Sequence, residues 1–194
     1  MRILRAAQKC YPDVKGGGAY HVHAMSRDQA AMGHDVTMLT VGTGPTADES
    51  AGYNIIRYPS WFSILGNDIS PGVWQHLCNG EAYDVVHAHS HLYFSTNLTA
   101  IHRRFSDAPL AITNHGLYSQ TAPERVFGAY LRTVGRWTYN VADVAFTYTD
   151  PERTALRELG IKTDITVIAN GIDTTRFTPI GTVSNHIVRD TPVV

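Results

Sequence analysis

Residues 1–22, which read MRILRAAQKCYPDVKGGGAYHV, decide the fold of this chain. The apolar run Ile3–Ala7 predicts a short strand, and three consecutive glycines, Gly16, Gly17 and Gly18, follow it. From Ala19 to Met32 the apolar positions recur at helical spacing, which predicts a helix. A strand that passes through a glycine-rich turn into a helix is the usual opening of a β-α-β unit.

The same alternation continues along the chain. Further strands are predicted at Asp35–Val41, Asn54–Tyr58, Asp84–Ala88, Leu110–Thr113, Val144–Thr149 and Ile165–Ile168. Helices are predicted late in Ser60–Asn79, at Leu92–Phe105, at Phe127–Asn140 and from a capping box at Thr149 and Glu152 to Gly160, whereas Gly42–Gly52 is predicted as a loop. This order predicts an α/β fold with a Rossmann-like parallel sheet and helices on both faces.

Composition narrows the class of protein. The 194 residues are 43% hydrophobic and 17% charged, against about 25% charged in typical chains, so a packed core is expected rather than disorder. The net charge of -1 gives no sign of nucleic-acid binding. Two cysteines, no signal-peptide pattern and no apolar run of membrane-spanning length predict a cytoplasmic protein.

The triple glycine is the first candidate site. A glycine turn before a helix lets backbone N–H groups approach a phosphate. The spacing matches neither the dinucleotide-binding fingerprint nor a P-loop, and a flexible loop is the alternative interpretation.

Histidines give two more candidates. His87, His89 and His91 alternate and would share one face of an extended strand, where they could bind zinc, although packing of His87 is the plainer explanation. His115, in Thr113-Asn114-His115-Gly116, could hydrogen-bond a phosphate or a sugar hydroxyl, or simply a loop carbonyl.

Two patterns lie nearer the C-terminus. Arg125, Arg132 and Arg136 are interspersed with aromatic residues at helical spacing. Such a helix face could meet an anionic acceptor or a membrane surface, or could merely be solvated. Asn170 and Gly171 form a turn signal directly after a predicted strand.

Taken in order, these features resemble the N-terminal half of family 4 glycosyltransferases. The matching stretches are Gly16–Val22, Gly33–Thr37, Asp84–His89, Thr113–Gly116 and Val167–Asp173 with Phe177 and Pro179. The resemblance implies a GT-B fold, in which two Rossmann-like domains face a cleft. It also implies sugar transfer with retention from a nucleotide diphosphate sugar, with no required metal or other cofactor, to a glycan, lipid or small-molecule acceptor.

The resemblance also assigns roles to residues. Gly16, Gly17 and Gly18 would approach the donor diphosphate, His115 would be the catalytic residue near the transferred sugar, and Asn170 and Gly171 would lie beside the cleft. Acceptor contacts would come from His89, Ser90, Tyr118 and Arg125, with possible peripheral membrane contact. Ala169 departs from the family, which usually has proline there.

The expected domain organisation follows from the same resemblance. Residues 1–179 would form the acceptor-side domain, and residues 180–194 a linker and the first strand of a missing donor-binding domain. On that view the chain alone is inactive. Three alternatives remain: a nucleotide-sugar 2-epimerase, which needs cleft carboxylates; a non-catalytic module that binds a glycan or an anionic lipid; and a histidine-based metalloenzyme.

Overall fold

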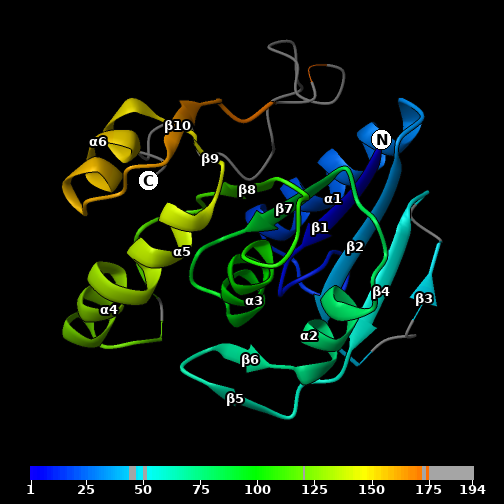
Figure 1. The fold of residues 1–194 in the computed structure, drawn as a ribbon, viewed down its shortest axis with the longest axis horizontal. Helices are drawn as coiled ribbons and strands as arrows, with labels where there is room; N and C mark the ends of the chain where they lie inside the picture. Colours follow the sequence, from blue (N-terminus) through cyan, green and yellow to red (C-terminus); the bar gives the residue numbers. More distant parts are fainter. Residues whose placement is uncertain (44–46, 50–51, 120, 172–173, 175–194) are drawn as a thin grey trace, which may run out of the picture.

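The fold is built on one large sheet, seen in a computed structural model that describes residues 1–43, 47–49, 52–119, 121–171 and 174 (Figure 1). The strand order is β10-β9-β8-β7-β1-β2-β4-β3, and all strands but β3 run parallel. The strands are β1 (Arg2–Ala6), β2 (Asp35–Val41), β3 (Ala47–Asp48), β4 (Asn54–Tyr58), β7 (Val85–His89), β8 (Leu110–Thr113), β9 (Val144–Thr147) and β10 (Asp164–Val167). The predicted parallel sheet is therefore confirmed.

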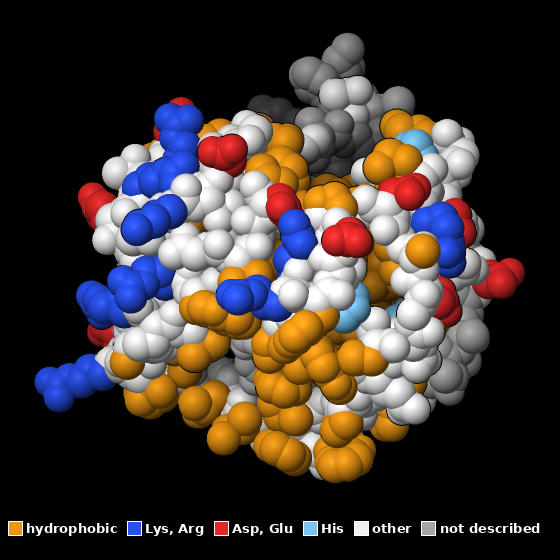
Figure 2. Space-filling model, in the orientation of Figure 1, with side chains coloured by type: hydrophobic (Ala, Val, Ile, Leu, Met, Phe, Trp, Pro, Cys, Tyr) orange, Lys and Arg blue, Asp and Glu red, His pale blue; other side chains and the backbone are white. Residues whose placement is uncertain are grey.

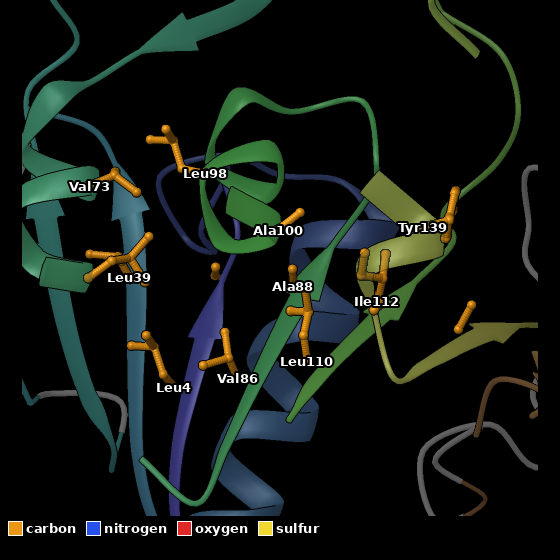
Figure 3. Close-up of a cluster of buried hydrophobic side chains, with 14 of the residues drawn as sticks. Leu4, Leu39, Val73, Val86, Ala88, Leu98, Ala100, Leu110, Ile112 and Tyr139 are labelled. Carbon is orange, nitrogen blue, oxygen red and sulfur yellow. The ribbon is translucent and has the colours of Figure 1, made fainter. Parts of the chain in front are cut away.

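Helices cover both faces of the sheet. The helices are α1 (Gly17–Ala31), α2 (Pro71–Cys78), α3 (Phe94–Arg103), α4 (Glu124–Tyr130), α5 (Arg136–Val141) and α6 (Asp150–Glu158). Helix α1 packs on one face, and α2, α3, α5 and α6 contribute to the main apolar cluster on the other. Figure 3 shows Leu4, Val86, Leu110 and other strand side chains directed into that cluster.

Three predicted segments differ in detail. The first half of Ser60–Asn79 forms a hairpin of β5 (Phe62–Ile64) and β6 (Asn67–Ile69), which turns through positive φ angles at Leu65 and Gly66. The predicted loop Gly42–Gly52 contains β3. The predicted helix Phe127–Asn140 is divided by a π-helical segment, Leu131–Gly135, so the constant spacing assumed for its arginines does not hold.

The helix cap at Thr149 was predicted correctly, with one change in geometry. The Thr149 hydroxyl accepts from the backbone N–H of Glu152 at 3.4 Å, as in a capping box. The Glu152 carboxylate, however, accepts from the N–H of Tyr148 at 2.9 Å rather than from that of Thr149. Gly160 then ends the helix with φ +81°.

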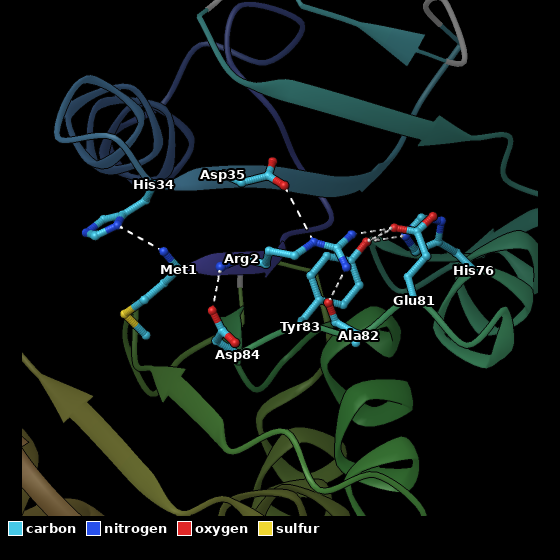
Figure 4. Close-up of polar contacts among 9 residues, drawn as sticks. All are labelled: Met1, Arg2, His34, Asp35, His76, Glu81, Ala82, Tyr83 and Asp84. Atoms are coloured by element: carbon cyan, nitrogen blue, oxygen red, sulfur yellow. Dashed lines mark hydrogen bonds and ion pairs between the residues drawn. The ribbon is translucent and has the colours of Figure 1, made fainter.

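At the amino end of the sheet, Arg2 joins three neighbouring segments (Figure 4). Its backbone N–H donates to the Asp84 carboxylate at 2.8 Å, and its guanidinium lies 3.5 Å from Asp35 and 3.4 Å from Glu81. These charged side chains are about half exposed, so each pair contributes little stability. The cluster nevertheless closes this end, and the opposite end carries the cavity described below.

Candidate functional site

The candidate site lies where the order of the strands changes direction. Strand β1 has β2 on one side and β7 on the other, so the loops that follow β1 and β7 diverge at the carboxyl edge of the sheet. Ligands of open α/β sheets bind in such a crevice. A cavity of about 910 Å³ opens there.

Most of the predicted site residues meet at this cavity. Those that line it are Gly16, Gly17, Gly18, His89, Ser90, His115, Tyr118 and Asn170. Gly171 and Arg125 do not line it, and Arg125 is exposed on α4. The residues that gather here come from the loops after β1, β7, β8 and β10, as expected for the carboxyl edge of a parallel sheet.

The lining of the cavity favours an anion. Lys9 and Lys15 lie on it, whereas none of its described lining residues is an aspartate or a glutamate. Positive charge without a compensating carboxylate attracts negatively charged ligands into a cleft. A 2-epimerase of the kind considered above would need carboxylates at this place, so the described lining does not favour that alternative.

The N-terminus of α1 adds backbone donors to the same wall. Gly16 is the N-cap, no side chain caps the helix, and its first turn holds no acidic residue. The first N–H groups of a helix have no partner within it and carry the positive end of its dipole. A Cβ at Gly16 or Gly17 would meet nothing within 4 Å, whereas one at Gly18 would lie 3.4 Å from His115 Nδ1. The glycines therefore leave room both for a ligand and for His115.

The three alternating histidines do not share one face, so that prediction was wrong. His87 and His89 lie on the α1 side of β7 with ring centroids 4.4 Å apart. The backbone then turns at Ser90, whose φ is +66°. His91 therefore points elsewhere, and its Nδ1 forms a hydrogen bond of 3.0 Å with the hydroxyl of Tyr139. In the described part of the chain, no group of three or more His, Cys, Asp or Glu residues could hold a metal ion.

A buried arginine stands behind the two histidines. Arg5 is fully buried on β1, and its Nη1 donates to His87 Nδ1 at 3.1 Å and to His89 Nε2 at 3.0 Å. Its Nη2 donates to the side-chain oxygen of Gln29 on α1, and the sulfur of Met25 on the same helix lies 2.8 Å from Nη1. Among the described residues no carboxylate forms an ion pair with Arg5. Burial lowers its pKa to about 10, so it stays charged at neutral pH.

His115 is held between two side chains rather than by a loop carbonyl. Its Nε2 lies 3.1 Å from His89 Nδ1, and its Nδ1 lies 3.1 Å from the hydroxyl of Tyr148. Burial, with a smaller contribution from the nearby His21, lowers the pKa of His115 to about 4, so the ring is neutral at pH 7. His89 likewise has both nitrogens engaged with protein partners.

Sequence reasoning missed Arg5, His21 and Tyr148 as site residues. His21 lies in the first turns of α1 with its ring 5.7 Å from that of His115, and its buried Nε2 has no hydrogen-bond partner among the described residues. Arg5 had a signal, a cation inside an apolar strand, and Tyr148 directly follows the strand end Thr147. Neither pattern predicts that Arg5 contacts His87 and His89, or that Tyr148 contacts His115.

One family model matches most of the chain. The model of Glycosyltransferase Family 4 matches residues 15–176. Glycogen synthase of Mycobacterium tuberculosis is 31% identical over an alignment 212 positions long, which covers 91% of this chain and 50% of that protein. The chain thus spans about half the length of the curated relatives it matches.

Solved structures support the fold. HepE of Anabaena in complex with UDP-glucose superimposes with a TM-score of 0.66 and 19% identity, over 92% of this chain and 47% of that one. A sucrose-phosphate synthase structure from Thermosynechococcus elongatus gives a TM-score of 0.58 and 16% identity, over 88% of this chain and 90% of that one. The described sheet is therefore that of one half of a GT-B glycosyltransferase.

Proposed function

The chain belongs to glycosyltransferase family 4, and from this premise we propose that it forms the acceptor-side domain of a retaining glycosyltransferase. The enzyme would move a sugar from a nucleotide diphosphate sugar to a glycan, lipid or small-molecule acceptor. One observation carries the proposal: a cavity without described carboxylates opens at the uncapped N-terminus of α1. Free backbone N–H groups and positive charge without carboxylates suit a diphosphate leaving group.

The leaving group would be met by backbone and lysine donors. The N–H groups of Gly17 and Gly18 at the start of α1, with Lys15 beside them, would stabilise charge that develops on the diphosphate. His115 would act near the transferred sugar, and Asn170 and Gly171 would lie toward the cleft. HepE was solved with UDP and with UDP-glucose, so uridine diphosphate sugars are the first donors to test.

The acceptor would be held on the other rim of the cavity. Tyr118 is exposed there, Ser90 sits at the turn after β7, and the β5–β6 hairpin contributes Ile64 and Leu65. Arg125 lies outside the cavity lining. It would therefore contact only those parts of the acceptor that project out of the cavity. Because both nitrogens of His89 are engaged with Arg5 and His115, its role would be to support the site.

The proposal is tested by a transfer assay on the full-length native gene product. Labelled UDP-glucose and related donors are incubated with glycan and lipid acceptors, and the anomeric configuration of the product is determined by NMR. We expect transfer with retention, and we expect Gly17→Asp to reduce it strongly because a carboxylate would repel the diphosphate. Isomerisation of the donor without any acceptor would instead favour the epimerase, and acceptor binding without transfer would favour a binding module.

The second part of the predicted domain organisation remains a proposal. Residues 180–194, expected to be a linker and a first strand, lie outside the described residues. We propose that turnover requires a donor-binding domain in addition to residues 1–179. The 194-residue chain, assayed beside the native gene product, should bind acceptor but transfer no sugar. Transfer by the isolated chain at the native rate would contradict this.

We also propose peripheral contact with an anionic membrane at its cytoplasmic face, and one exposed surface supports such a contact. Trp61, Phe62, Ile64 and Leu65 of the hairpin are each half or more exposed. Figure 2 shows hydrophobic side chains gathered along the lower edge of the molecule, where the hairpin lies, with basic side chains on the flank beside α4. Apolar side chains flanked by arginines suit the interface of an anionic bilayer. In the described part of the chain, no helix has the length and apolar character to span a membrane.

Vesicle co-sedimentation tests this contact. We expect the protein to bind phosphatidylglycerol vesicles more strongly than neutral phosphatidylcholine vesicles. Replacing Trp61 and Phe62 by serine, or Arg125 and Arg132 by glutamate, should weaken binding, whereas Phe105→Ser, which removes another exposed aromatic ring, should not. Equal binding by all variants would remove the proposal.

A further inference from the structure

We propose that Tyr148 is a ligand-binding residue of the cavity, and that the buried Arg5 sets the direction in which its hydroxyl donates, through His89 and His115. The identity of the ligand, a nucleotide diphosphate sugar, rests on the proposed function. The hydrogen-bond argument itself rests on four side chains of the described structure.

The direction of the chain is fixed at Arg5. A guanidinium has five N–H donors and no acceptor, so any ring nitrogen that bonds to it must accept. Arg5 Nη1 carries two N–H groups and has three neighbours, His87 Nδ1, His89 Nε2 and the sulfur of Met25, of which the thioether is the weakest acceptor. The two N–H groups therefore point to the two ring nitrogens, and His89 Nε2, 3.0 Å away, carries no proton. The proton of the neutral His89 ring is then on Nδ1, which faces His115.

The same logic passes through the next ring. His89 Nδ1 donates to His115 Nε2 at 3.1 Å, which leaves the proton of His115 on Nδ1. That Nδ1 donates to the Tyr148 hydroxyl oxygen at 3.1 Å. If the hydrogen bonds ran the other way, Tyr148 would donate to His115 and His115 would donate to His89 Nδ1. The His89 proton would then be on Nε2, where it would point at the Arg5 N–H group. Two donors facing each other in a buried site is an arrangement that proteins avoid.

Tyr148 is thereby left with its own proton to donate. Its oxygen accepts from His115, and no other hydrogen bond of this hydroxyl occurs among the described residues. The side chain lines the same cavity as Gly16 and His115, and burial raises the pKa of the phenol, which keeps it protonated. The group that reaches a ligand oxygen is therefore the Tyr148 O–H, while His115, with both nitrogens engaged, positions it.

A branch of the same network provides an internal control. Arg5 Nη1 also lies 3.1 Å from His87 Nδ1, so His87 must accept there and carry its proton on Nε2. That nitrogen donates to the Thr113 hydroxyl at 2.7 Å. The network thus predicts opposite tautomers for neighbouring rings: Nε2–H for His87, but Nδ1–H for His89 and His115.

Long-range proton–nitrogen correlation NMR on the native protein at pH 7 tests the tautomers directly. We expect the three assignments just given in the wild type, and a mixed or changed His89 tautomer in Arg5→Met. His115 with its proton on Nε2, or protonated on both nitrogens, would overturn the relay. The wild-type spectrum decides this even if the Arg5 variant does not fold.

Titration calorimetry of the full-length native gene product with UDP-glucose tests the role of Tyr148. A hydrogen bond to a charged group contributes about 1.5–3 kcal/mol, so Tyr148→Phe should weaken binding by about 10-fold or more. Tyr20→Phe, on an exposed tyrosine outside the cavity lining, should leave the affinity unchanged. Unchanged affinity in Tyr148→Phe would overturn the ligand contact. Failure of the wild type to bind any nucleotide sugar would overturn the proposed function and this contact with it, whereas the tautomers are judged separately.

Discussion

The two faces of the central strands are both buried, yet toward the carboxyl edge of the sheet one face is apolar and the other is largely polar. Toward α3, strands β1, β7 and β8 present Leu4, Ala6, Val86, Ala88, Leu110 and Ile112. Toward α1, Ile3 and Val85 at the starts of β1 and β7 join a second apolar cluster. Farther along the same strands and β8, the residues are Arg5, His87, His89 and Thr113, which bond to one another. Buried side chains therefore serve two different purposes in this sheet. The apolar face stabilises the fold, while the polar face orients the groups that line the cavity.

The largest effect is expected from truncation on the apolar face. Leu110→Ala should lower the free energy of unfolding by about 3 kcal/mol, because it removes buried methyl groups and leaves a cavity. Urea unfolding measures the change. Ile168→Ala, at an exposed position after β10, should cost less than about 0.5 kcal/mol. A similar cost at both positions would remove the distinction between core and surface on which the comparison depends.

The second effect is expected at low pH, where the buried histidines of the polar face should lower the free energy of unfolding. Burial lowers the pKa of His115 to about 4, so the unfolded chain takes up a proton between pH 6.5 and 4 that the folded chain does not. The stabilisation is therefore complete above pH 6.5 and decreases as the pH falls through this window. Each such ring contributes a slope of up to about 1.4 kcal/mol per pH unit.

Urea unfolding at several pH values between 7 and 4.5 measures this slope. His87 and His89 shift in the same direction, with burial again the largest cause, so a slope should remain in His115→Gln but be shallower than in the wild type. If the variant keeps the full slope, His115 is not one of the groups responsible.

A smaller effect is expected where one polar partner is removed. Thr113→Val keeps the shape of the side chain but leaves the His87 Nε2–H without its acceptor, at a cost of about 1–3 kcal/mol. Thr166→Val, on the exposed side of β10, should change the free energy of unfolding by less than about 0.5 kcal/mol. Equal costs at the two threonines would show that the hydrogen bond between His87 and Thr113 contributes no measurable stability.

The smallest change in stability is expected at Arg5 itself. Arg5→Met fills a similar volume and removes the cost of burying a charge, while two ring nitrogens lose a donor. A buried charge without an ion-pair partner is itself costly, so its removal should offset the loss of these hydrogen bonds. The free energy of unfolding should therefore stay within about 1 kcal/mol of the wild type. A loss as large as that of Leu110→Ala would mean that Arg5 chiefly holds the fold together.

Much of the fold could be predicted from local pattern. The strands Asp35–Val41, Asn54–Tyr58 and Leu110–Thr113 were placed at their observed ends, because each is a dense β-branched or apolar run between turn residues. The hairpin after β4 was missed because its strands have three residues each, too few for a periodic pattern. That these residues would lie close together was predicted in outline, since glycines and histidines that follow strands must meet at one edge of a parallel sheet.

What the sequence by itself determined was the alternation of elements, the caps and the set of residues at the carboxyl edge, because these depend on neighbours along the chain. The tertiary structure alone decided which rings share a face and which partners they have. The positive φ at Ser90 separates His91 from His89, and the register of β1 against β7 sets Arg5 beside His87. Such contacts join residues more than 80 positions apart. No local pattern encodes them, because strand pairing and helix packing create them together.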